Sequence, residues 1–597
     1  MNALFPSLVL LLVVIWPLLL AGSLLLSAAH SVVLRFAPWG GLPALILAVF
    51  APPSVSLHLP WLLLGTELGL VDDTGRLFLL FTALLWWVAG IYARAYLSDE
   101  PGHSRFFVYF LLSMAGNLGL ILAQDLASFY LFFALMSFAS YGLVVHEGSI
   151  EALRAGRIYI LLVVIGEVAL FAAMVLATSA TGATEFATVR QGLAQADLRD
   201  LIMLLAFIGF GIKAGVLGLH LWLPLAHPVS PTPASAVLSG AMIKAGLLGW
   251  LRLLPLGEVT LLQWGEAFMA LGLAAAFYGV VVGLTQRDPK TLLAYSSISQ
   301  MGILTMAVGL GLAAPEGYPA ILTAITLYAL HHGLCKGALF LGVGVVGVCR
   351  GTQRRWAWFA MWLPALALAG APLTSGMAAK FLLKAQTVNA PGPWVSVLQT
   401  ALPWSAVATT LLVGRLLFLL YQPKAGAVNH HSPAGLIRPW ALLVAGTVVL
   451  PWWFVPETPT LWSQTTVLGS LWPLLFGAVL TIIAVLWRAH LTRNPGAMPI
   501  RDGQTPAGYL TPRIPPGDLL IPISACIAPA LTYGRRLANE QLPRWLDARL
   551  ASLRRLWFNV DWQRIIATRE SSLNHWSKTM VLLVLLGLII ATLGASQ

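Results

Sequence analysis

Long runs of apolar residues, separated by short polar segments, recur along almost the whole chain. A helix that crosses a membrane needs about 20 mostly apolar residues, and each run has roughly that length. The sequence therefore predicts an all-α polytopic membrane protein with about 16 transmembrane helices. The predicted spans are residues 5–27, 32–51, 76–97, 106–123, 126–146, 155–178, 199–219, 232–254, 263–284, 292–313, 319–347, 357–383, 399–421, 437–454, 468–487 and 577–595.

Basic residues between these runs are concentrated in alternate loops. Arg94 and Arg105 flank the third loop and Arg154 and Arg157 lie in the fifth, whereas most even-numbered loops carry no basic residue. By the positive-inside rule the odd-numbered loops face the cytoplasm. The pattern predicts a multi-pass protein of the cell inner membrane with both termini on the outer side.

The composition agrees with a membrane protein and gives no sign of a cofactor. Hydrophobic residues make up 58% of the chain and charged residues 10%, against about 25% charged in soluble domains. The three cysteines, Cys335, Cys349 and Cys526, lie far apart, and no metal-binding, nucleotide-binding or haem-attachment motif is present. We expect no cofactor and no metal on this chain, which leaves open whether it is part of an enzyme.

One long hydrophilic segment, residues 488–576, precedes the last apolar run. Its second half interleaves basic residues with Leu, Trp and Ile at helical spacing, which is typical of an amphipathic helix on a membrane surface. It could lie on the cytoplasmic face of the bilayer or along a neighbouring subunit. The formal net charge of +12 therefore indicates lipid and protein partners, and nothing indicates nucleic acid.

Several lysines lie inside apolar runs, where a charge is costly. An ionisable residue at membrane depth costs a few kcal/mol and is a functional-site hypothesis by default. Unlike arginine, a desolvated lysine can lose its proton and regain it. For any one of them the alternative is a structural hydrogen bond or a side chain that reaches the interface, most of all for Lys384 at a helix end. The candidates are Lys213, Lys244, Lys336, Lys380 and Lys384.

Two of these lysines lie beside helix breakers. Lys213 stands in "GFGIKAGVLGLHLWLPLAHP", and Lys380 follows Pro372 and Gly376. Gly and Pro interrupt a membrane helix and free backbone groups, which is tolerated only beside protein or water. Paired interrupted helices with polar residues are typical of the ion sites of inverted-repeat transporters.

A polar stripe lies between the two interrupted helices. Tyr328, His332 and Lys336 follow one another at intervals of four residues, so they share a helix face, while His331 points about 100° away. Histidine titrates near neutral pH and can relay protons. Ser239, near Lys244, offers a further polar step. The alternative for the histidines is a hydrogen bond that cements helix packing.

Four motifs give the chain a resemblance to a known family over about residues 60–425. They are "LHLWLPLAHPVSPTPASAVLSGAMIKAGLLGWLR", "RDPKTLLAYSSISQMGIL", "LHHGLCKGALFLGVG" and "GAPLTSGMAAKFLLK". In this order they resemble the antiporter-like proton-translocating membrane subunits of respiratory complex I, Mrp-type cation/proton antiporters and energy-converting hydrogenases. The chain looks most similar to the large membrane subunit of hydrogenase-4 and formate hydrogenlyase type complexes.

The resemblance implies a fold and a set of proton sites. It implies two inverted five-helix repeats that contain broken helices, and it assigns the chain of proton sites to Lys213, Lys244, His332, Lys336 and Lys380. The implied domains are 1–105 (helices 1–3), 106–255 (first repeat), 256–425 (second repeat), 426–487 (helices 14–15), 488–576 (basic segment) and 577–597 (last helix).

The sequence departs from the family pattern at one position. Family members usually carry a glutamate on the fifth helix that pairs with the first lysine, whereas "SFYLFFALMSFASYGLV" has Ala134 there. Glu167 on the sixth predicted helix is the one acid deep inside a neighbouring apolar run and is the candidate substitute acid. The alternative is that its contact is structural and that this half of the proton path is altered or lost. Asp125 lies near the outer end of the fifth helix and is expected to be a cap or a surface residue.

The leading interpretation is a proton-translocating antiporter-like subunit of a redox-driven complex with other membrane subunits and soluble redox subunits. A second is a Na+/H+ antiporter subunit that uses Glu167 or Asp125 at the cation. A third is a non-conducting membrane scaffold for a soluble enzyme, which the alanine at position 134 favours. Transport of another small species, such as inorganic carbon, on the same fold is a related alternative.

Overall fold

The computed structural model describes residues 4–25, 30–52, 54–60, 62, 65–100, 102–422, 433–493 and 514–517. The chain divides into two compact units, Met1–Pro516 and Gly517–Gln597, and every element named below belongs to the first. The predicted helix at 577–595 and most of the basic segment 488–576 lie outside the described residues.

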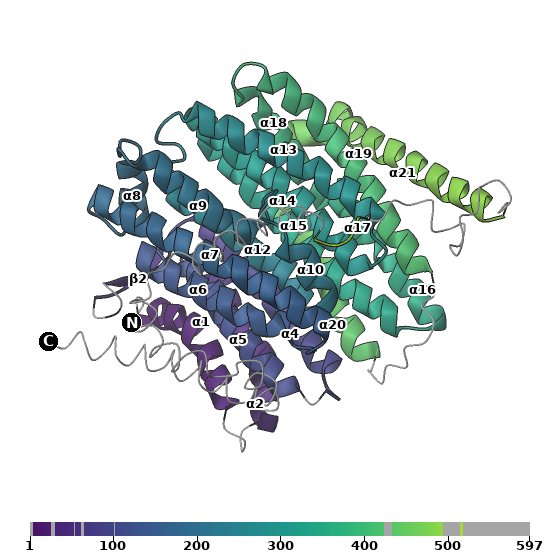
Figure 1. The fold of residues 1–597 in the computed structure, drawn as a ribbon, viewed down its shortest axis with the longest axis horizontal. Coiled ribbons are helices and arrows are strands. Elements are labelled where there is room, and N and C mark those ends of the chain that lie inside the picture. The colour runs from purple at the N-terminus through teal and green to yellow at the C-terminus, as the bar shows by residue number, and fades with distance from the viewer. Residues whose placement is uncertain are drawn as a thin grey trace, which may run out of the picture. The chain divides into compact units, whose positions relative to one another are not determined.

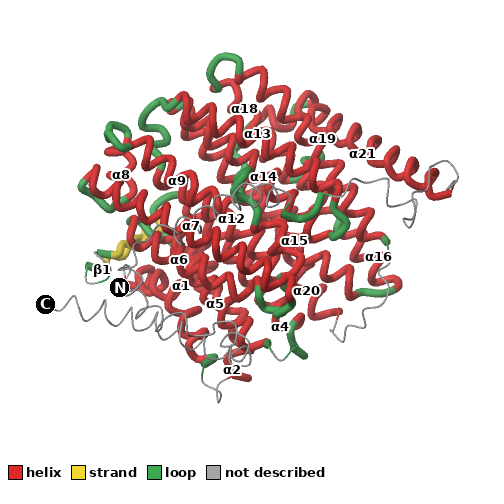
Figure 2. Tube along the Cα trace, viewed as in Figure 1, coloured by secondary structure: helices red, strands yellow, loops and turns green. Residues whose placement is uncertain are grey.

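Helices make up nearly all of the described chain (Figure 2). Those of the N-terminal half are α1 (Leu4–Ser23), α2 (His30–Phe36), η2 (Ala37–Gly41), α3 (Leu42–Phe50), α4 (Asp73–Tyr96), α5 (His103–Leu122), α6 (Leu126–Val144), α7 (Ile150–Thr181), α8 (Phe186–Leu193), α9 (Arg199–Ala214), α10 (Trp222–Val229), α11 (Thr232–Val237), η3 (Leu238–Met242), α12 (Ile243–Leu253) and α13 (Leu262–Thr285). Those that follow are α14 (Pro289–Ala313), η4 (Pro315–Gly317), α15 (Tyr318–Val348), α16 (Gly351–Ala360), α17 (Trp362–Ala369), α18 (Ser375–Ala385), η5 (Gln386–Asn389), α19 (Trp394–Tyr421), α20 (Pro433–Val449), η6 (Leu450–Phe454), η7 (Pro459–Trp462) and α21 (Gln464–Arg493).

Twelve helical segments among the described residues are long and apolar enough to cross a membrane. The other predicted runs in this part of the chain fall on α1, whose apolar stretch Ser7–Ser23 is shorter, and on two interrupted helices. The first interrupted helix is α9 followed by α10, and the second is α17 followed by α18. The protein is therefore a multi-pass membrane protein, and the limits of its two five-helix repeats stay a prediction.

A two-stranded hairpin, β1 (Val55–Leu59) and β2 (Thr66–Leu70), interrupts the helices. Its antiparallel register runs from Val55 opposite Leu70 to Leu59 opposite Thr66. The hydrophobic pattern predicted only a loop here, because five-residue strands are too short to give a periodic signal against the long helices on either side.

The most enclosed helices lie in the middle of the first unit (Figure 1). The span Thr232–Leu253 and α14 are wholly surrounded by protein, and α15 nearly so, whereas only 11% of the apolar window of α21 is buried. The long α15 packs against α4, α11, α14, α18 and α20. It therefore brings together helices from both halves of the sequence.

Helices α13 and α14 approach each other backbone to backbone. A Cβ atom on Gly272 would lie 2.5 Å from the Gly302 carbonyl oxygen, and one on Gly309 would lie 2.6 Å from the Gly265 carbonyl oxygen. Small residues allow such close contact in membranes, where packing rather than water exclusion holds helices together. This packing fixes α14 as a rigid wall beside α15.

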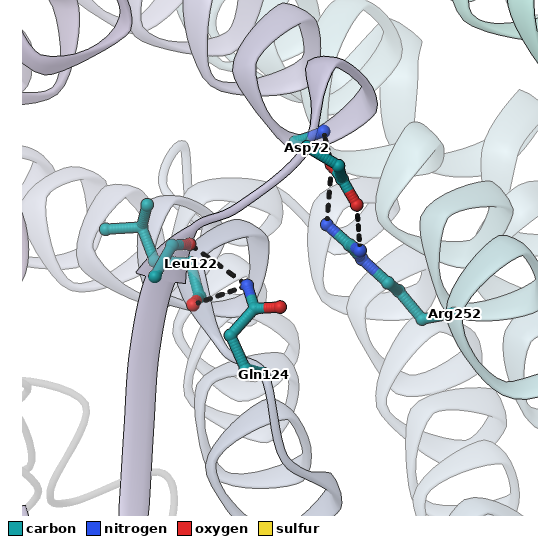
Figure 3. Close-up of polar contacts among 6 residues, drawn as sticks. Asp72, Leu122, Gln124 and Arg252 are labelled. Carbon is teal, nitrogen blue, oxygen red and sulfur yellow. Dashed lines mark hydrogen bonds and ion pairs between the residues drawn. The ribbon is translucent and has the colours of Figure 1, made fainter. Parts of the chain in front are cut away.

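Polar contacts of Asp72 and Gln124 join several elements of the fold (Figure 3). The carboxylate of Asp72 accepts a hydrogen bond from the backbone N–H of Gly75 at 2.5 Å, which caps α4, and pairs with the guanidinium of Arg252 at the end of α12. Nearby, Gln124 Nε2 donates to the carbonyl oxygens of Gly69 (3.0 Å) and Leu122 (3.2 Å). These bonds tie α4 to α12 and the hairpin to α5.

Candidate functional site

The lysines selected from the sequence differ in burial. Lys213 (3% exposed), Lys244 (1%) and Lys336 (0%) are enclosed by protein. Lys380 is half-buried and Lys384 is exposed. The structure thus separates four lysines that are at least partly buried, called the buried lysines below, from the exposed Lys384, for which an interfacial position was the alternative.

Lys213 occupies an aromatic pocket. Its Nζ donates to the hydroxyl oxygen of Tyr159 at 3.2 Å, and that hydroxyl donates to the carbonyl oxygen of Ser137 at 2.8 Å. The ring centroids of Phe133, Tyr159 and Trp222 lie 5.6–6.0 Å from the ammonium. Aromatic faces attract a cation, so the pocket offsets part of the hydration that Lys213 loses on burial.

Glu167 lies beside Lys213 and is also buried, at 4% exposed. Both side chains line a cavity of about 10 Å³, roughly the room that one water needs. Their opposite charges attract across it, and Oε2 of Glu167 has no hydrogen-bond partner among the described residues. Ala134 is half-buried and does not line this cavity. Among the described residues that line this cavity, Glu167 is therefore the only acid, and it is the candidate substitute for the glutamate that Ala134 replaces.

The break between α9 and α10 is built around a left-handed glycine. Gly215 has φ = 76°, and the backbone N–H groups of Gly215 and Val216 both donate to the Gly211 carbonyl oxygen. The indole N–H of Trp222 donates to the Ile212 carbonyl oxygen at 2.7 Å. Backbone groups freed by the break are thus satisfied by protein, as the membrane interior requires.

A π-helical turn adjoins Lys244. The turn η3 precedes α12 directly, and Nζ of Lys244 donates to the carbonyl oxygen of Ser239 at 2.6 Å. π-Turns inside α-helices are frequent at functional sites because they redirect side chains and alter the carbonyl ladder. Here the turn places a backbone acceptor within reach of a buried ammonium.

A bridge of two serines connects the Lys244 region to Lys336. Ser239 Oγ lies 2.6 Å from Ser297 Oγ, and Ser297 donates to the Leu293 carbonyl oxygen at 3.0 Å. Since each hydroxyl has one proton, Ser239 is the donor to Ser297. Nζ of Lys336 donates to the same Leu293 oxygen at 2.8 Å. Polar contacts therefore lead from α12 through α14 to α15: each lysine is bonded to a backbone carbonyl oxygen, and the two serine hydroxyls lie between them.

The two histidines of α15 have different surroundings. Nδ1 of His331 lies 2.9 Å from Ser375 Oγ at the start of α18, and Ser375 donates to the Thr447 carbonyl oxygen at 3.1 Å. His332 is fully buried, and neither ring nitrogen has a hydrogen-bond partner among the described residues. His331, which lies off the predicted polar stripe, is thus the histidine that reaches the second interrupted helix.

Lys380 repeats the plan of Lys213 in the second interrupted helix. α17 ends at Gly370 (φ = 87°), and the non-glycine residue Leu373 has φ = 64° before α18 begins. Nζ of Lys380 donates to the Ala369 carbonyl oxygen at 2.7 Å. Left-handed backbone at a non-glycine residue costs of order 1–3 kcal/mol and clusters at functional sites.

Tyr328 contributes to the second half of the site. Its hydroxyl donates to Gln300 Oε1 at 2.7 Å, and Gln300 Nε2 donates to Thr409 Oγ1 at 3.1 Å. Tyr328 also lines the cavity that contains Lys380. The predicted stripe on α15 is therefore divided, with Lys336 facing the serines and Tyr328 facing the region of Lys380.

Asp125 is a helix cap, as expected. Its Oδ1 accepts from the backbone N–H of Ser128 at 2.8 Å and its Oδ2 accepts from that of Glu67 at 2.9 Å. Both oxygens are engaged by the protein. In the described part of the chain, no group of three or more His, Cys, Asp or Glu side chains is placed to hold a metal ion.

Three features of the site were not predicted from the sequence. Tyr159 and Ser297 were not selected, and His331 was named without its contact to α18. Tyr159 lies eight residues before Glu167 on α7, so helical spacing could have grouped the two. Ser297 belongs to a quoted motif, but nothing in its spacing distinguishes it from its neighbour Ser296. Only the packing of α14 against η3 selects it.

We predict that Ser297→Ala lowers proton transport without preventing folding. The variant leaves the Ser239 hydroxyl without its acceptor and breaks the bridge, at a cost of about 1–3 kcal/mol. Proton uptake by vesicles that contain the intact complex, compared at equal protein content, measures the effect. Ser296→Ala is the matched control because that buried hydroxyl has no hydrogen-bond partner among the residues that the structure describes. Equal transport by both variants would contradict a role for the bridge.

Comparison with known proteins shows which family the central part of the chain resembles. Residues 123–402 match the family model described as NADH:quinone oxidoreductase/Mrp antiporter, transmembrane region. The matched segment contains all four buried lysines and Glu167. The matched segment belongs to the antiporter-like family of membrane subunits.

Curated relatives of this antiporter-like chain come from different bacteria. Hydrogenase-4 component B of Escherichia coli is 33% identical over 46% of this chain and 43% of its own length. A putative antiporter subunit of Staphylococcus saprophyticus is 34% identical over 55% of this chain and 44% of its own length. An uncharacterized protein of Mycobacterium tuberculosis is 32% identical over 58% of this chain and 57% of its own length. The chain spans about half the length of these relatives.

Two solved structures share the fold of this antiporter-like chain. A chain of the Mrp complex from Dietzia sp. aligns with a TM-score of 0.71 at 22% identity, over 92% of this chain and 62% of that one. A chain of the archaeal membrane-bound sulfane sulfur reductase aligns with a TM-score of 0.65 at 19% identity, over 79% of this chain and 99% of that one. At these identities the likeness establishes the fold.

Proposed function

We propose that this chain is the proton-translocating antiporter-like subunit of a redox-driven, multi-subunit membrane complex. The observation that carries the proposal is the polar connection from Lys244 through Ser239 and Ser297 to Leu293 and Lys336, because it joins the two halves of the molecule inside the membrane. A buried lysine serves proton transfer because it can release and regain a proton, and a neighbouring charge biases that exchange.

The proposed path begins at Lys213 and Glu167 and ends at Lys380. A proton displaced from Lys213 moves toward Lys244, and the positive charge that it adds there biases the protonation of Lys336 and of the histidines of α15. His331 and Ser375 then connect α15 to α18, which carries Lys380. Each step requires only that the charge of one group changes the proton affinity of its neighbour. We propose that the energy comes from redox subunits elsewhere in the complex.

The partners and location follow from the same proposal. Relatives named as hydrogenase and antiporter components, and structural neighbours named as complexes, support other membrane subunits as partners. We propose a cell inner membrane location with both termini on the outer side, on the basis of the alternating basic loops. The exposed apolar face of α7, which includes Val164, Val168 and Phe171, suits contact with lipid or a neighbouring subunit.

Glu167→Gln tests the substitute acid. Glutamine keeps the size and polarity of the side chain but removes the charge that attracts Lys213, so we expect proton uptake per electron to fall at least severalfold. The measurement uses sealed vesicles that contain the intact complex, with electron transfer followed separately. Glu151→Gln, in the exposed first turn of the same helix, is the matched control. Unchanged pumping in Glu167→Gln would mean that its contact is structural.

Sodium/proton antiport is a second candidate function. The relatives include a protein named as a Na(+)/H(+) antiporter subunit from Staphylococcus saprophyticus, 31% identical over 44% of this chain. Because both oxygens of Asp125 accept backbone hydrogen bonds, Glu167 is the available acid for such a cation. Sodium-dependent proton movement in vesicles without any electron donor would favour this function over the redox-driven one.

A further inference from the structure

A cavity of about 350 Å³ opens beside Lys380, between α18, α19 and α21. Its volume lies within the range of roughly 300–1,000 Å³ that is typical of ligand sites. The lining residues that bear on its chemistry are Tyr328, Lys380, Lys384, Leu402, Thr466 and Pro473. No step of the proposed proton path needs a space of this size.

The charged residues that line the cavity are all positive. Lys380 and Lys384, one helical turn apart on α18, are the only charged residues that line it in the described part of the chain, and no carboxylate from that part lines it. Two ammonium groups have six N–H donors, yet the only protein acceptor found for them among the described residues is the Ala369 carbonyl oxygen. Like charges in one cavity repel each other, and an anion between them would relieve the repulsion. The cavity therefore selects an anion.

The polarity of the wall changes with depth. Thr466 lies at the start of the apolar span Gln464–Trp487, and Lys384 lies in the last turn of α18. Seven residues further along α21, at about 1.5 Å per residue, Pro473 lies roughly 10 Å deeper. Leu402 on α19 also lines the cavity. A cation at the membrane boundary, Lys384, above a second cation and an apolar wall matches an anionic amphiphile better than a small ion.

We propose that this cavity binds the phosphate group of an anionic phospholipid, held by Lys384 and Lys380, with an acyl chain along Leu402 and Pro473. Basic pockets between membrane helices bind such head groups by charge and hydrogen bonds. The sparse burial of α21, 11% of its apolar window, leaves this side of the described unit open to lipid. The site shares Lys380 with the proposed proton path, but the proposal does not rest on transport, and its test needs no transport assay.

The test measures lipid binding to the full chain purified in detergent and stripped of lipid. Native mass spectrometry and thermal unfolding would be followed during titration with phosphatidylglycerol, with phosphatidylcholine and with inorganic phosphate. We expect phosphatidylglycerol to bind and to raise the melting temperature more than phosphatidylcholine does. Equal effects of the two lipids would overturn the proposal. Saturable binding of inorganic phosphate, lost in Lys384→Gln, would support the same oxyanion site with a free anion as its occupant.

Two variants assign the binding to this cavity. Lys384→Gln removes an exposed ammonium, and we expect it to weaken phosphatidylglycerol binding about tenfold, the loss of roughly one charge-assisted hydrogen bond. Gly469→Leu fills the cavity, since Gly469 lines it and a Cβ atom there would meet no atom within 4 Å. We expect it to abolish the lipid-dependent shift without loss of folding.

Arg355→Gln, at an exposed cation of α16 that does not line the cavity, is the matched control and should bind lipid like the unmodified chain. Normal phosphatidylglycerol binding by both Gly469→Leu and Lys384→Gln would place the lipid elsewhere and refute the proposal. Because Lys384 is exposed, its variant remains informative even if Gly469→Leu folds poorly.

Discussion

Proton translocation should fall at least tenfold when Lys213 is replaced by methionine, while the complex still assembles. Methionine keeps much of the length and fills the pocket formed by Phe133, Tyr159 and Trp222, but it carries no proton. The loss follows because Lys213 is the only lysine at the cavity that Glu167 shares. Proton uptake in sealed vesicles, with the driving electron transfer measured in parallel, gives the ratio of protons to electrons.

Lys213→Arg separates the charge of this residue from its ability to release a proton. Arginine stays charged in proteins, so we expect this variant to be as inactive as Lys213→Met. Full activity of Lys213→Arg would show that a fixed positive charge is sufficient and that no proton leaves this residue. Normal pumping by both variants would make Lys213 a structural residue and favour the scaffold interpretation.

Removal of one partner from a buried charge pair can also destabilise the fold, by about 3–5 kcal/mol. Lys213→Met would leave Glu167 as an acid in an apolar pocket. The double variant Lys213→Met with Glu167→Gln removes that uncompensated acid and should recover the stability of the complex but not its transport. Recovery of transport as well would contradict a role for Lys213 in proton transfer.

Gly376→Ala should destabilise the second interrupted helix more than any other single-methyl change in that region. A Cβ atom on Gly376 would lie 1.8 Å from the Ala367 carbonyl oxygen and 2.9 Å from the Ala367 carbonyl carbon. Backbone atoms cannot rotate away, so α18 must move off α17. Overpacking typically costs about 1–3 kcal/mol and occasionally more, and we expect this variant at or above the upper end. The displacement would also pull Lys380 from the Ala369 oxygen.

Gly469→Ala is the matched control for this change. It adds the same methyl group within α21, where nothing lies within 4 Å of the new atom. We expect its effect to stay within about 0.5 kcal/mol, as for most substitutions in open positions. Melting temperature and yield in detergent measure both variants. Equal stability of the two would mean that α17 and α18 are not packed as closely as the structure has them.

The interrupted helices show why part of the site can be predicted from the sequence. Gly215 and Gly370 both adopt left-handed backbone beside a lysine-bearing segment. Breaks of this kind depend on glycine and proline in a few consecutive residues, so they leave a local signal. The same is true of the cap at Asp125, where the short acidic side chain precedes an apolar run.

Contacts between distant helices left no such signal. The pairing of Ser239 with Ser297 joins residues 58 positions apart. Ser296 looks equivalent in the sequence, although its hydroxyl has no hydrogen-bond partner within the described part of the chain. Likewise, the polar stripe on α15 favoured His332, whereas His331 contacts α18. Helix periodicity gives the face of a single helix but not the neighbour that will cover it.

The sequence by itself determined that this chain crosses the membrane many times, carries lysines at membrane depth and breaks two helices beside them. These are local properties, because about 20 apolar residues suffice to define a span. Only the tertiary structure decided that Glu167 shares a cavity with Lys213 and that serines link α12 to α15. It also decided that a cavity with positively charged lining residues opens at Lys380 and Lys384. These features depend on how helices far apart in the chain pack, and small residues at their contacts determine that packing.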